Sequence, residues 1–166
     1  TLMDITAENY IKEFTGGSHL LVRTLVHMDN PDHKIYRAMT HSWFSPPNLI
    51  KLKSDIELLA RDYVDKMRDS GSECDFVNDI SALYPLRVIM TILGVPPEDE
   101  NLMLKLTQQL FGGNDEDMKR SEEESIDSNV IADFFNYFTA LTEERRKNPT
   151  DDVATVIANA NFKGEQ

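Results

Sequence analysis

Cysteine is almost absent from the sequence, whose 166 residues contain only Cys74. A single thiol can neither form a disulfide within the chain nor supply the paired cysteines of a zinc ribbon or a redox motif. The four histidines offer no substitute, because no two are four residues apart and none follows Glu or Asp at the third position. These spacings exclude the His-Glu-x-x-His zinc motif and the Glu-x-x-His half-sites of di-iron bundles. We therefore expect no metal held by protein ligands in this segment, and a reducing, cytoplasmic location.

Basic residues and long apolar runs are also scarce. Seventeen Lys and Arg stand against 29 Asp and Glu, which gives a formal net charge of -12. Such a charge excludes functions whose affinity comes mainly from neutralising nucleic-acid phosphates. The longest apolar stretch, 80–95, is interrupted by four residues and falls short of the roughly 20 apolar residues of a membrane span. The sequence also lacks a phosphate-binding glycine loop and the Gly-x-Ser-x-Gly elbow of hydrolases.

Helical periodicity is the dominant positive signal. Apolar residues recur every three or four positions, which is typical of amphipathic helices. We predict helices over 32–44, 49–68, 79–94, 98–111, 131–147 and 153–160. The buried stripe predicted for the fifth of these consists of Ile131, Phe134, Phe135, Phe138 and Leu141. The predicted fold class is mainly α, multihelical, with at most one or two short strands. Residues 74–77 are expected to be a connector or one brief strand.

Several residues have the chemistry of helix ends. Asp79 is suited to begin the third predicted helix, and Gly94 to end it with a positive φ. The run 150–152 is suited to cap the last helix, while Arg145 and its basic neighbours stand where the helix dipole favours cations. These positions predict the boundaries of the helices.

One stretch combines residues with binding chemistry. His33 and Arg37 are four apart and therefore lie on one face of one predicted helix. An imidazole and a planar guanidinium together suit the binding of carboxylates. The alternative is an ordinary solvated helix face with Arg37 paired to a nearby Asp.

The stretch from Asp29 to Arg37, followed by Phe44-Ser45-Pro46, resembles the haem-clamping helix of the bacterial cytochrome P-450 family. The family pattern is Asp-Pro-Pro-x-His-x-x-x-Arg and then Phe-Ser/Thr-Pro, with Asn30 here in place of the first Pro. Similar stretches follow in the family's order: the buried central helix at 84–96, the helix over the substrate at 104–109, and the junction before the oxygen-activating helix at 145–152. The resemblance is nearest to the terpene-hydroxylating members.

The resemblance implies that residues 1–166 are part of a cytochrome P-450 catalytic domain. They would comprise the substrate-loop region, the proximal haem-clamp helix and the helices up to the one before the oxygen-activating helix. The family's loop with the axial Cys ligand of haem is not in this sequence, and Cys74 stands at a connector position, where we expect a partly buried thiol. We therefore expect this segment to contain no catalytic residue and to be inactive alone.

The resemblance also implies roles for individual residues. His33 and Arg37 would bind the propionates of haem b, and Leu25 and Val26 would approach the haem edge. The residues expected to face the substrate are Leu21, Leu110 and Phe111. For Leu106 we expect packing in the core, because apolar residues at helical spacing are ordinarily core.

The complete protein would be a monooxygenase that hydroxylates a small hydrophobic, terpenoid-like substrate with O2. Its electrons would come from NAD(P)H through a ferredoxin-type redox partner. Residues 33–68 carry seven Lys and Arg against four Asp and Glu, so a basic segment lies within the acidic chain. The candidate contacts for an acidic partner are Lys34, Lys51, Lys53 and Arg61, with a solvated helix face as the alternative. No contact with nucleic acid or a membrane is expected.

A second function class stays open at this point. The same helices could form a cofactor-free, all-helical interaction module, in which His33 and Arg37 are ordinary surface residues. The two functions differ in the coding sequence expected to follow. The monooxygenase requires an Ala/Gly-Gly-x-Asp/Glu-Thr-Thr helix and later a Phe-x-x-Gly-x-x-x-Cys loop, and the interaction module requires neither.

Overall fold

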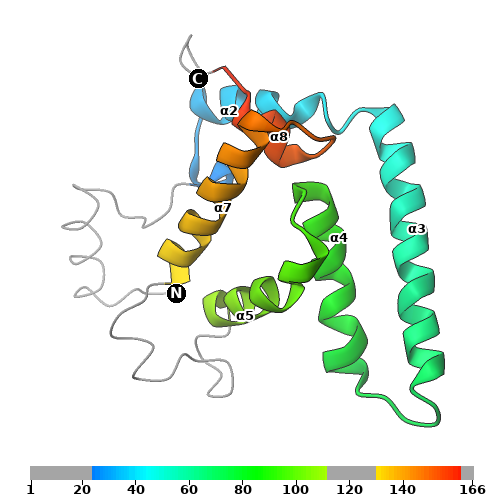
Figure 1. The fold of residues 1–166 in the computed structure, drawn as a ribbon. Coiled ribbons are helices and arrows are strands. Elements are labelled where there is room, and N and C mark those ends of the chain that lie inside the picture. The colour runs from blue at the N-terminus through cyan, green and yellow to red at the C-terminus, as the bar shows by residue number, and fades with distance from the viewer. Residues whose placement is uncertain (1–23, 112–129, 162–166) are drawn as a thin grey trace. The chain divides into compact units, whose positions relative to one another are not determined.

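Helices make up all the regular structure in the part of the chain that the computed structural model describes, which is residues 24–111 and 130–161 (Figure 1). In chain order the elements are η1 (Leu25–His27), α2 (Asp32–His41), α3 (Pro46–Asp69), η2 (Phe76–Ser81), α4 (Leu83–Leu93), η3 (Pro97–Asp99), α5 (Glu100–Phe111), α7 (Val130–Lys147) and α8 (Val153–Ala158). The predicted mainly α fold is confirmed. Of the two alternatives for residues 74–77, the connector agrees better with the structure than the brief strand, because the segment is irregular up to Asp75 and helical from Phe76.

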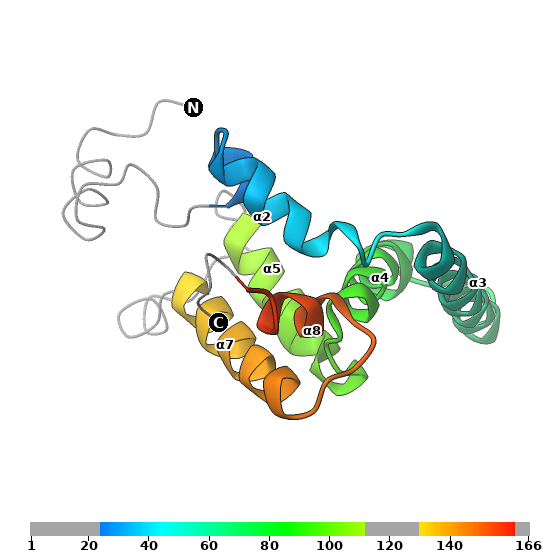
Figure 2. The same cartoon turned by 90° about the horizontal axis from the view of Figure 1, so that it is seen from above.

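The chain divides by its internal contacts into two compact units, residues 1–39 and 40–166. The described part of the first unit contains η1 and α2 as far as Met39. The second contains α3 and all later elements, with α4 between α3 and α5 (Figure 2).

The first two predicted helices are present with shifted ends. Helix α2 begins at Asp32, as predicted, but ends at His41 rather than at 44. Helix α3 begins at Pro46, three residues earlier than predicted. Proline is favoured at the first helical position, where its missing N–H would have no intrahelical partner. Ser45 is therefore the N-cap of α3, and Pro46 and Pro47 are its first helical residues.

The start of the third predicted helix differs from the expectation for Asp79. Residues 76–81 form a π-helical turn, and α4 begins only at Leu83. The carboxylate of Asp75 caps the turn by accepting hydrogen bonds from the backbone N–H groups of Val77 at 3.2 Å and Asn78 at 3.1 Å. Asp79 instead accepts from the backbone N–H of Asp75 at 3.1 Å. The two acids share the cap, and the sequence pattern identified only one of them.

The connector before this turn also corrects an expectation. Cys74 is exposed and free, not partly buried. It stands in the irregular segment between α3 and the π-helical turn.

The core of the second unit lies where α4, α5, α7 and α8 meet. Its most buried members include Met90, Met103, Leu106 and Leu141. Leu106 is 3% exposed, which confirms its predicted packing role. A set of half-buried residues on α4 and α7 packs against this cluster, including Leu86, Phe134, Tyr137 and Phe138.

Phe135 is the exception in the stripe predicted for α7. It is 55% exposed, whereas Leu141 is buried and Phe134 and Phe138 pack on the core. At 100° per residue, Phe135 is displaced by roughly a quarter-turn from the centre of the stripe formed by the others. Phe135 is four residues after Ile131, which is a helical spacing, but its ring lies at the edge of the buried stripe.

Helix α3 packs on α4 through aromatic rings. Tyr63, the buried residue of α3, makes an edge-to-face contact with Tyr84 at 5.6 Å between ring centroids. Its hydroxyl donates a hydrogen bond to Glu100 Oε2 at 3.3 Å, and Arg87 Nε lies 3.6 Å from the same oxygen. Burial, with the neighbouring Glu100 carboxylate, raises the pKa of Tyr63 to about 12. The phenol is therefore a neutral donor at any physiological pH.

Within residues 24–111 and 130–161, one helical stretch, Phe76–Leu93, reaches the length and apolarity of a membrane span, with a mean hydropathy of 1.3 over 18 residues. The polar residues that interrupt 80–95 predict instead that this region falls short of a span. Length and composition alone are weak evidence for a span, and 6% of this window is buried inside the protein. Here the stretch changes from π-helix to α-helix and contains Arg87, which pairs with Glu100.

Candidate functional site

The predicted clamp residues lie on α2, directly after a turn that anchors its first residues. The backbone N–H of His33 donates to Asp29 O at 3.0 Å, and that of Ile35 donates to Pro31 O at 3.3 Å. This turn begins the helix at Asp32, so His33 and Arg37 fall one helical turn apart on one face. His33 is half-buried and Arg37 is exposed. The backbone geometry assumed for the pair in the sequence analysis is confirmed.

Two apolar side chains precede the clamp helix. Leu25 and Val26 lie in the 3-10 turn η1, and are 40% and 87% exposed. The adjoining His27 has Nδ1 at 2.9 Å from the Thr24 hydroxyl oxygen, which ties the turn to its own start. The apolar side chain of Val26 is almost fully exposed to water. Covering it with the apolar edge of a ligand would be favourable.

The donor set of the first unit fits the carboxylates of a haem group. Arg37 presents a planar fork of N–H donors and His33 an imidazole, while η1 supplies apolar surface a few residues earlier in the chain. Carboxylates require cationic or N–H donors, and a porphyrin edge requires apolar contact. The residues present supply both kinds of contact.

The predicted substrate residues belong to the other unit or lie outside the described residues. Leu110 and Phe111 end α5 and are 39% and 80% exposed. Leu106, one turn earlier, is in the core, so the side of α5 that carries Leu106 is already occupied. Leu21 lies outside the described residues.

The four predicted partner-binding cations are exposed, but two have carboxylate partners. Lys51 forms an ion pair with Asp151, and Lys53 Nζ lies 3.7 Å from Glu57 one turn later on α3. The hydrogen bond and the charge of Asp151 raise the pKa of Lys51. Lys34 and Arg61 complete the set. The basic segment is therefore partly neutralised, by Glu57 within the segment and by Asp151, which lies outside the residue count for 33–68.

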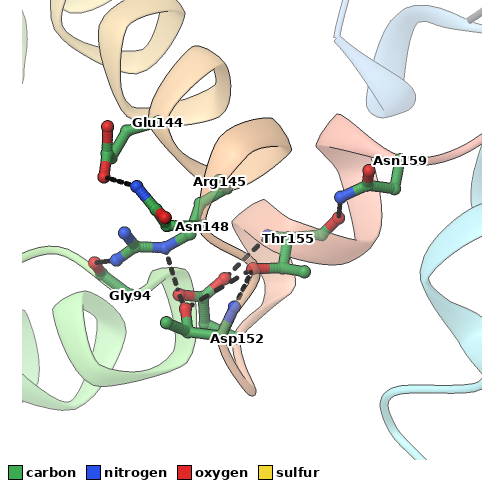
Figure 3. A network of polar contacts seen from close by, with 8 residues as sticks. Gly94, Glu144, Arg145, Asn148, Asp152, Thr155 and Asn159 are labelled. Carbon is green, nitrogen blue, oxygen red and sulfur yellow. Dashed lines mark hydrogen bonds and ion pairs between the residues drawn. The ribbon is translucent and has the colours of Figure 1, made fainter.

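A buried polar network is the main feature that the sequence analysis did not predict. Arg145, near the end of α7, donates from Nε to Asp152 Oδ2 at 2.7 Å and from a terminal nitrogen to Gly94 O at 2.6 Å (Figure 3). Asp152 is 4% exposed and also accepts from the backbone N–H of Thr155 at 2.7 Å, as the N-cap of α8. The network therefore joins the ends of α4 and α7 to the start of α8.

The sequence predicts a different helix-end role for each part of this network. Gly94 has φ 73° and ends α4, and Asp152 caps α8, so both predictions are confirmed. Arg145 was expected only to complement a helix dipole. A β-carbon built on Gly94 would lie 1.9 Å from Asp152 Oδ2, so glycine is required by contact as well as by its backbone conformation. No sequence spacing connects residues 94 and 152, and only the folded chain shows that they meet.

Lowering the pH should remove the contribution of Asp152 to stability. Burial alone would raise the pKa of its carboxyl, but hydrogen bonds from Thr150, Thr155 and Arg145 hold the pKa below its usual range. The pKa of an Asp carboxyl in the unfolded chain is about 4. A carboxyl whose pKa is lower in the folded protein stabilises the fold fully above that pH, and this stabilisation is lost as the pH falls through the folded-state pKa. In urea unfolding, the stability difference between wild type and Asp152→Asn should be largest at neutral pH and shrink below about pH 4. A difference independent of pH would contradict a role for the charge.

The comparisons with known proteins agree with the observed helical fold. No protein-family model matches the chain. It is 39% identical to cytochrome P-450-terp from Pseudomonas sp over 171 residues, which cover 98% of this chain and 40% of that protein. It is 28% identical to linalool 8-monooxygenase from Pseudomonas putida over 158 residues, with 95% of this chain and 38% of that protein covered.

A solved structure gives the same result. The crystal structure of CYP108D1 from Novosphingobium aromaticivorans matches 97% of this chain with 48% identity and a TM-score of 0.78, and this match covers 37% of that chain. The chain thus spans about two fifths of the length of the curated relatives it matches. Sequence and fold together show that the chain belongs to the bacterial cytochrome P-450 family, near its terpene-hydroxylating members.

Proposed function

We propose that the protein containing this chain is a cytoplasmic, haem-dependent monooxygenase that hydroxylates a small hydrophobic, terpenoid-like substrate. The observation that carries the proposal is that His33 and Arg37 lie on the same face of α2, and that the exposed apolar turn η1 precedes this helix in the chain. The names of two relatives, P-450-terp and linalool 8-monooxygenase, support a terpenoid as the substrate class. Haem b, when bound, would supply the chemistry of dioxygen activation.

The chain's own contribution to haem binding is charge pairing and apolar cover. Arg37 would donate two N–H groups to one propionate, and His33 would donate to the other from its ring. Leu25 and Val26 would lie against the porphyrin edge and be removed from water. These contacts fix the orientation of the cofactor without taking part in the reaction.

Leu110 and Phe111 would contribute apolar surface to the substrate site, together with Leu21. The support is their exposure at the end of α5, where an 80% exposed phenylalanine is available to a ligand. Leu106 is not part of this set, because the core already covers it.

An acidic, ferredoxin-type protein would deliver electrons from NAD(P)H at the basic segment formed by Lys34, Lys51, Lys53 and Arg61. Complementary charge increases the rate at which such partners meet. Because Lys51 and Lys53 have carboxylate partners, Lys34 and Arg61 would carry more of the attraction.

Reversing these charges should slow electron delivery. In the full-length enzyme, Lys34→Glu with Arg61→Glu should lower the rate of reduction by an acidic ferredoxin at low salt, and the difference should shrink as salt screens the charges. Lys147→Glu, an equally exposed cation on α7, is the control and should have a smaller effect. Equal effects of the variants would contradict a basic docking site on this segment.

The experiment that tests the function is turnover of the full-length, haem-loaded protein with ferredoxin, ferredoxin reductase, NADH and a panel of terpenoid alcohols. In 18O2, the expected product carries one labelled hydroxyl oxygen. Substrate-dependent NADH use without labelled product from any terpenoid, together with labelled product from a steroid or alkane, would contradict the substrate class. Failure to retain haem would contradict the proposed clamp.

A further inference from the structure

Two adjacent acids at the start of α5 each accept a hydrogen bond from a tyrosine on a different helix. The hydroxyl of Tyr63 on α3 donates to Glu100 Oε2 at 3.3 Å, and the hydroxyl of Tyr137 on α7 donates to Asp99 Oδ2 at 2.5 Å. Tyr63 is buried, and the other three residues are half-buried. These two tyrosine–carboxylate pairs join the start of α5 to two separate helices.

The helix dipole alone does not account for these acids. A carboxylate near the start of a helix is favourable by itself, because the dipole is positive there, and the exposed Glu98 already supplies that charge. Asp99 and Glu100 in addition accept from tyrosine hydroxyls, and a hydrogen bond to an ionised acceptor is stronger than one between neutral groups. Burial, with the Asp99 carboxylate, raises the pKa of Tyr137, as burial and Glu100 raise that of Tyr63. Both phenols are therefore neutral donors at physiological pH.

Directional contacts hold the start of α5, whereas apolar packing holds its middle. Met103 and Leu106 are buried in the core, and the attraction that buries them has no preferred direction. A hydrogen bond, in contrast, restricts both a distance and an angle. Arg87 of α4, with Nε 3.6 Å from Glu100 Oε2, adds a third contact at the same end. The start of α5 is therefore fixed in position and rotation by side chains from α3, α4 and α7.

The other end of α5 carries two of the residues expected to face the substrate. Leu110 and Phe111 are 39% and 80% exposed there. At a rise of about 1.5 Å per residue, Phe111 lies about 16 Å along the helix from Glu100, so a tilt of about 5° at the start moves the end by more than about 1 Å. A misplacement of about 1 Å can change a reaction rate by roughly a hundredfold. The start of α5 can therefore affect a substrate that touches only its end.

We propose that Tyr63 and Tyr137 are positioning residues, which fix the start of α5 through the two acids and thereby the place of Leu110 and Phe111. As far as it concerns the substrate, this inference rests on the proposed function. Neither tyrosine is a catalytic residue. A role in stability alone would leave the site of hydroxylation on the substrate unchanged, whereas a positioning role changes it.

The first test measures the end of α5 and needs no substrate. Spin labels are attached to Phe111→Cys and to Val64→Cys, an exposed position on α3, in the full-length, haem-loaded protein with Cys74→Ser. Pulsed electron paramagnetic resonance gives the distribution of distances between the two labels. Circular dichroism checks that each variant is folded.

The variant Tyr63→Phe with Tyr137→Phe keeps both rings and removes both hydroxyls. It should shift or broaden the distance distribution by at least about 1 Å. Tyr84→Phe, which removes a hydroxyl that belongs to neither pair, should leave the distribution unchanged. Asp99→Asn keeps an acceptor oxygen and should match wild type, whereas Asp99→Leu should match Tyr137→Phe alone. A wild-type distribution in the double tyrosine variant would overturn the proposal.

The second test compares the hydroxylated products of the same variants without spin labels. The substrate is whichever terpenoid, steroid or alkane gives the wild-type enzyme the most 18O-labelled product, so that a wrong substrate class does not affect the outcome. The ratio of product regioisomers should change by about twofold or more in the double tyrosine variant and stay constant in Tyr84→Phe. A wild-type ratio in a double variant that has lost stability would show a structural role only and overturn the proposal.

Discussion

Replacing Gly94 by alanine should lower the free energy of unfolding by about 2–5 kcal/mol. The left-handed backbone at this residue, with φ 73°, costs a residue with a β-carbon about 1–2 kcal/mol. The new β-carbon would also meet the Asp152 carboxylate at 1.9 Å, which forces the acid away from Arg145. Leaving these buried groups imperfectly paired costs roughly a further 1–3 kcal/mol. Urea unfolding of the full-length protein, followed by circular dichroism, measures the change.

Gly71→Ala is the matched control. Gly71 also has a positive φ, of 85°, but a β-carbon there would meet nothing within 4 Å. This variant should lose only the backbone cost of about 1–2 kcal/mol. Equal losses at the two glycines would show that the contact with Asp152 contributes nothing to stability.

Replacing Arg37 by alanine should weaken haem binding by roughly ten- to a hundredfold in the full-length enzyme. A hydrogen bond to a charged group contributes about 1.5–3 kcal/mol, and about 1.4 kcal/mol corresponds to a factor of ten. Arg37→Lys keeps the charge but loses the two-pronged geometry, so it should fall between alanine and wild type. Haem content after gel filtration, and the reduction potential, are the measurements.

Arg61→Ala is a control for nonspecific loss of positive charge, since this exposed arginine lies on α3 outside the clamp helix. It should leave haem content unchanged. Haem retention and a reduction potential that are the same in Arg37→Ala as in wild type would argue against a propionate contact.

Most of the helices follow directly from apolar spacing, because a stripe with a period near 3.6 has to be buried on one side. The same reasoning gives Leu106 and Leu141 as core, and the structure agrees. Capping chemistry gives Gly94 and the run 150–152 as helix ends, and the structure selects Asp152 from that run. Apolar spacing fails at Phe135, which is one position off the centre of its stripe. Periodicity defines a face, but the packed neighbours decide how wide the buried part of that face is.

The clamp residues of the candidate site could be predicted from the sequence, whereas the ion pairs could not. Helical geometry alone places His33 and Arg37 on one face, whereas their role depended on the resemblance to a family. The pairs of Lys51 with Asp151 and of Arg145 with Asp152 could not be predicted, because the residues meet only after the helices pack. The tyrosine–carboxylate pairs at the start of α5 are of the same kind, because their members are 37 and 38 positions apart in the chain.

Haem dissociation from the double variant His33→Ala with Arg37→Ala tests the central claim most directly. Transfer of haem from the full-length protein to an excess of apomyoglobin gives the dissociation rate. If both residues bind propionates, the double variant should release haem at least about a hundredfold faster than wild type, and each single variant should lie between the two. Release at the wild-type rate in the double variant would contradict the assignment of α2 as the haem clamp.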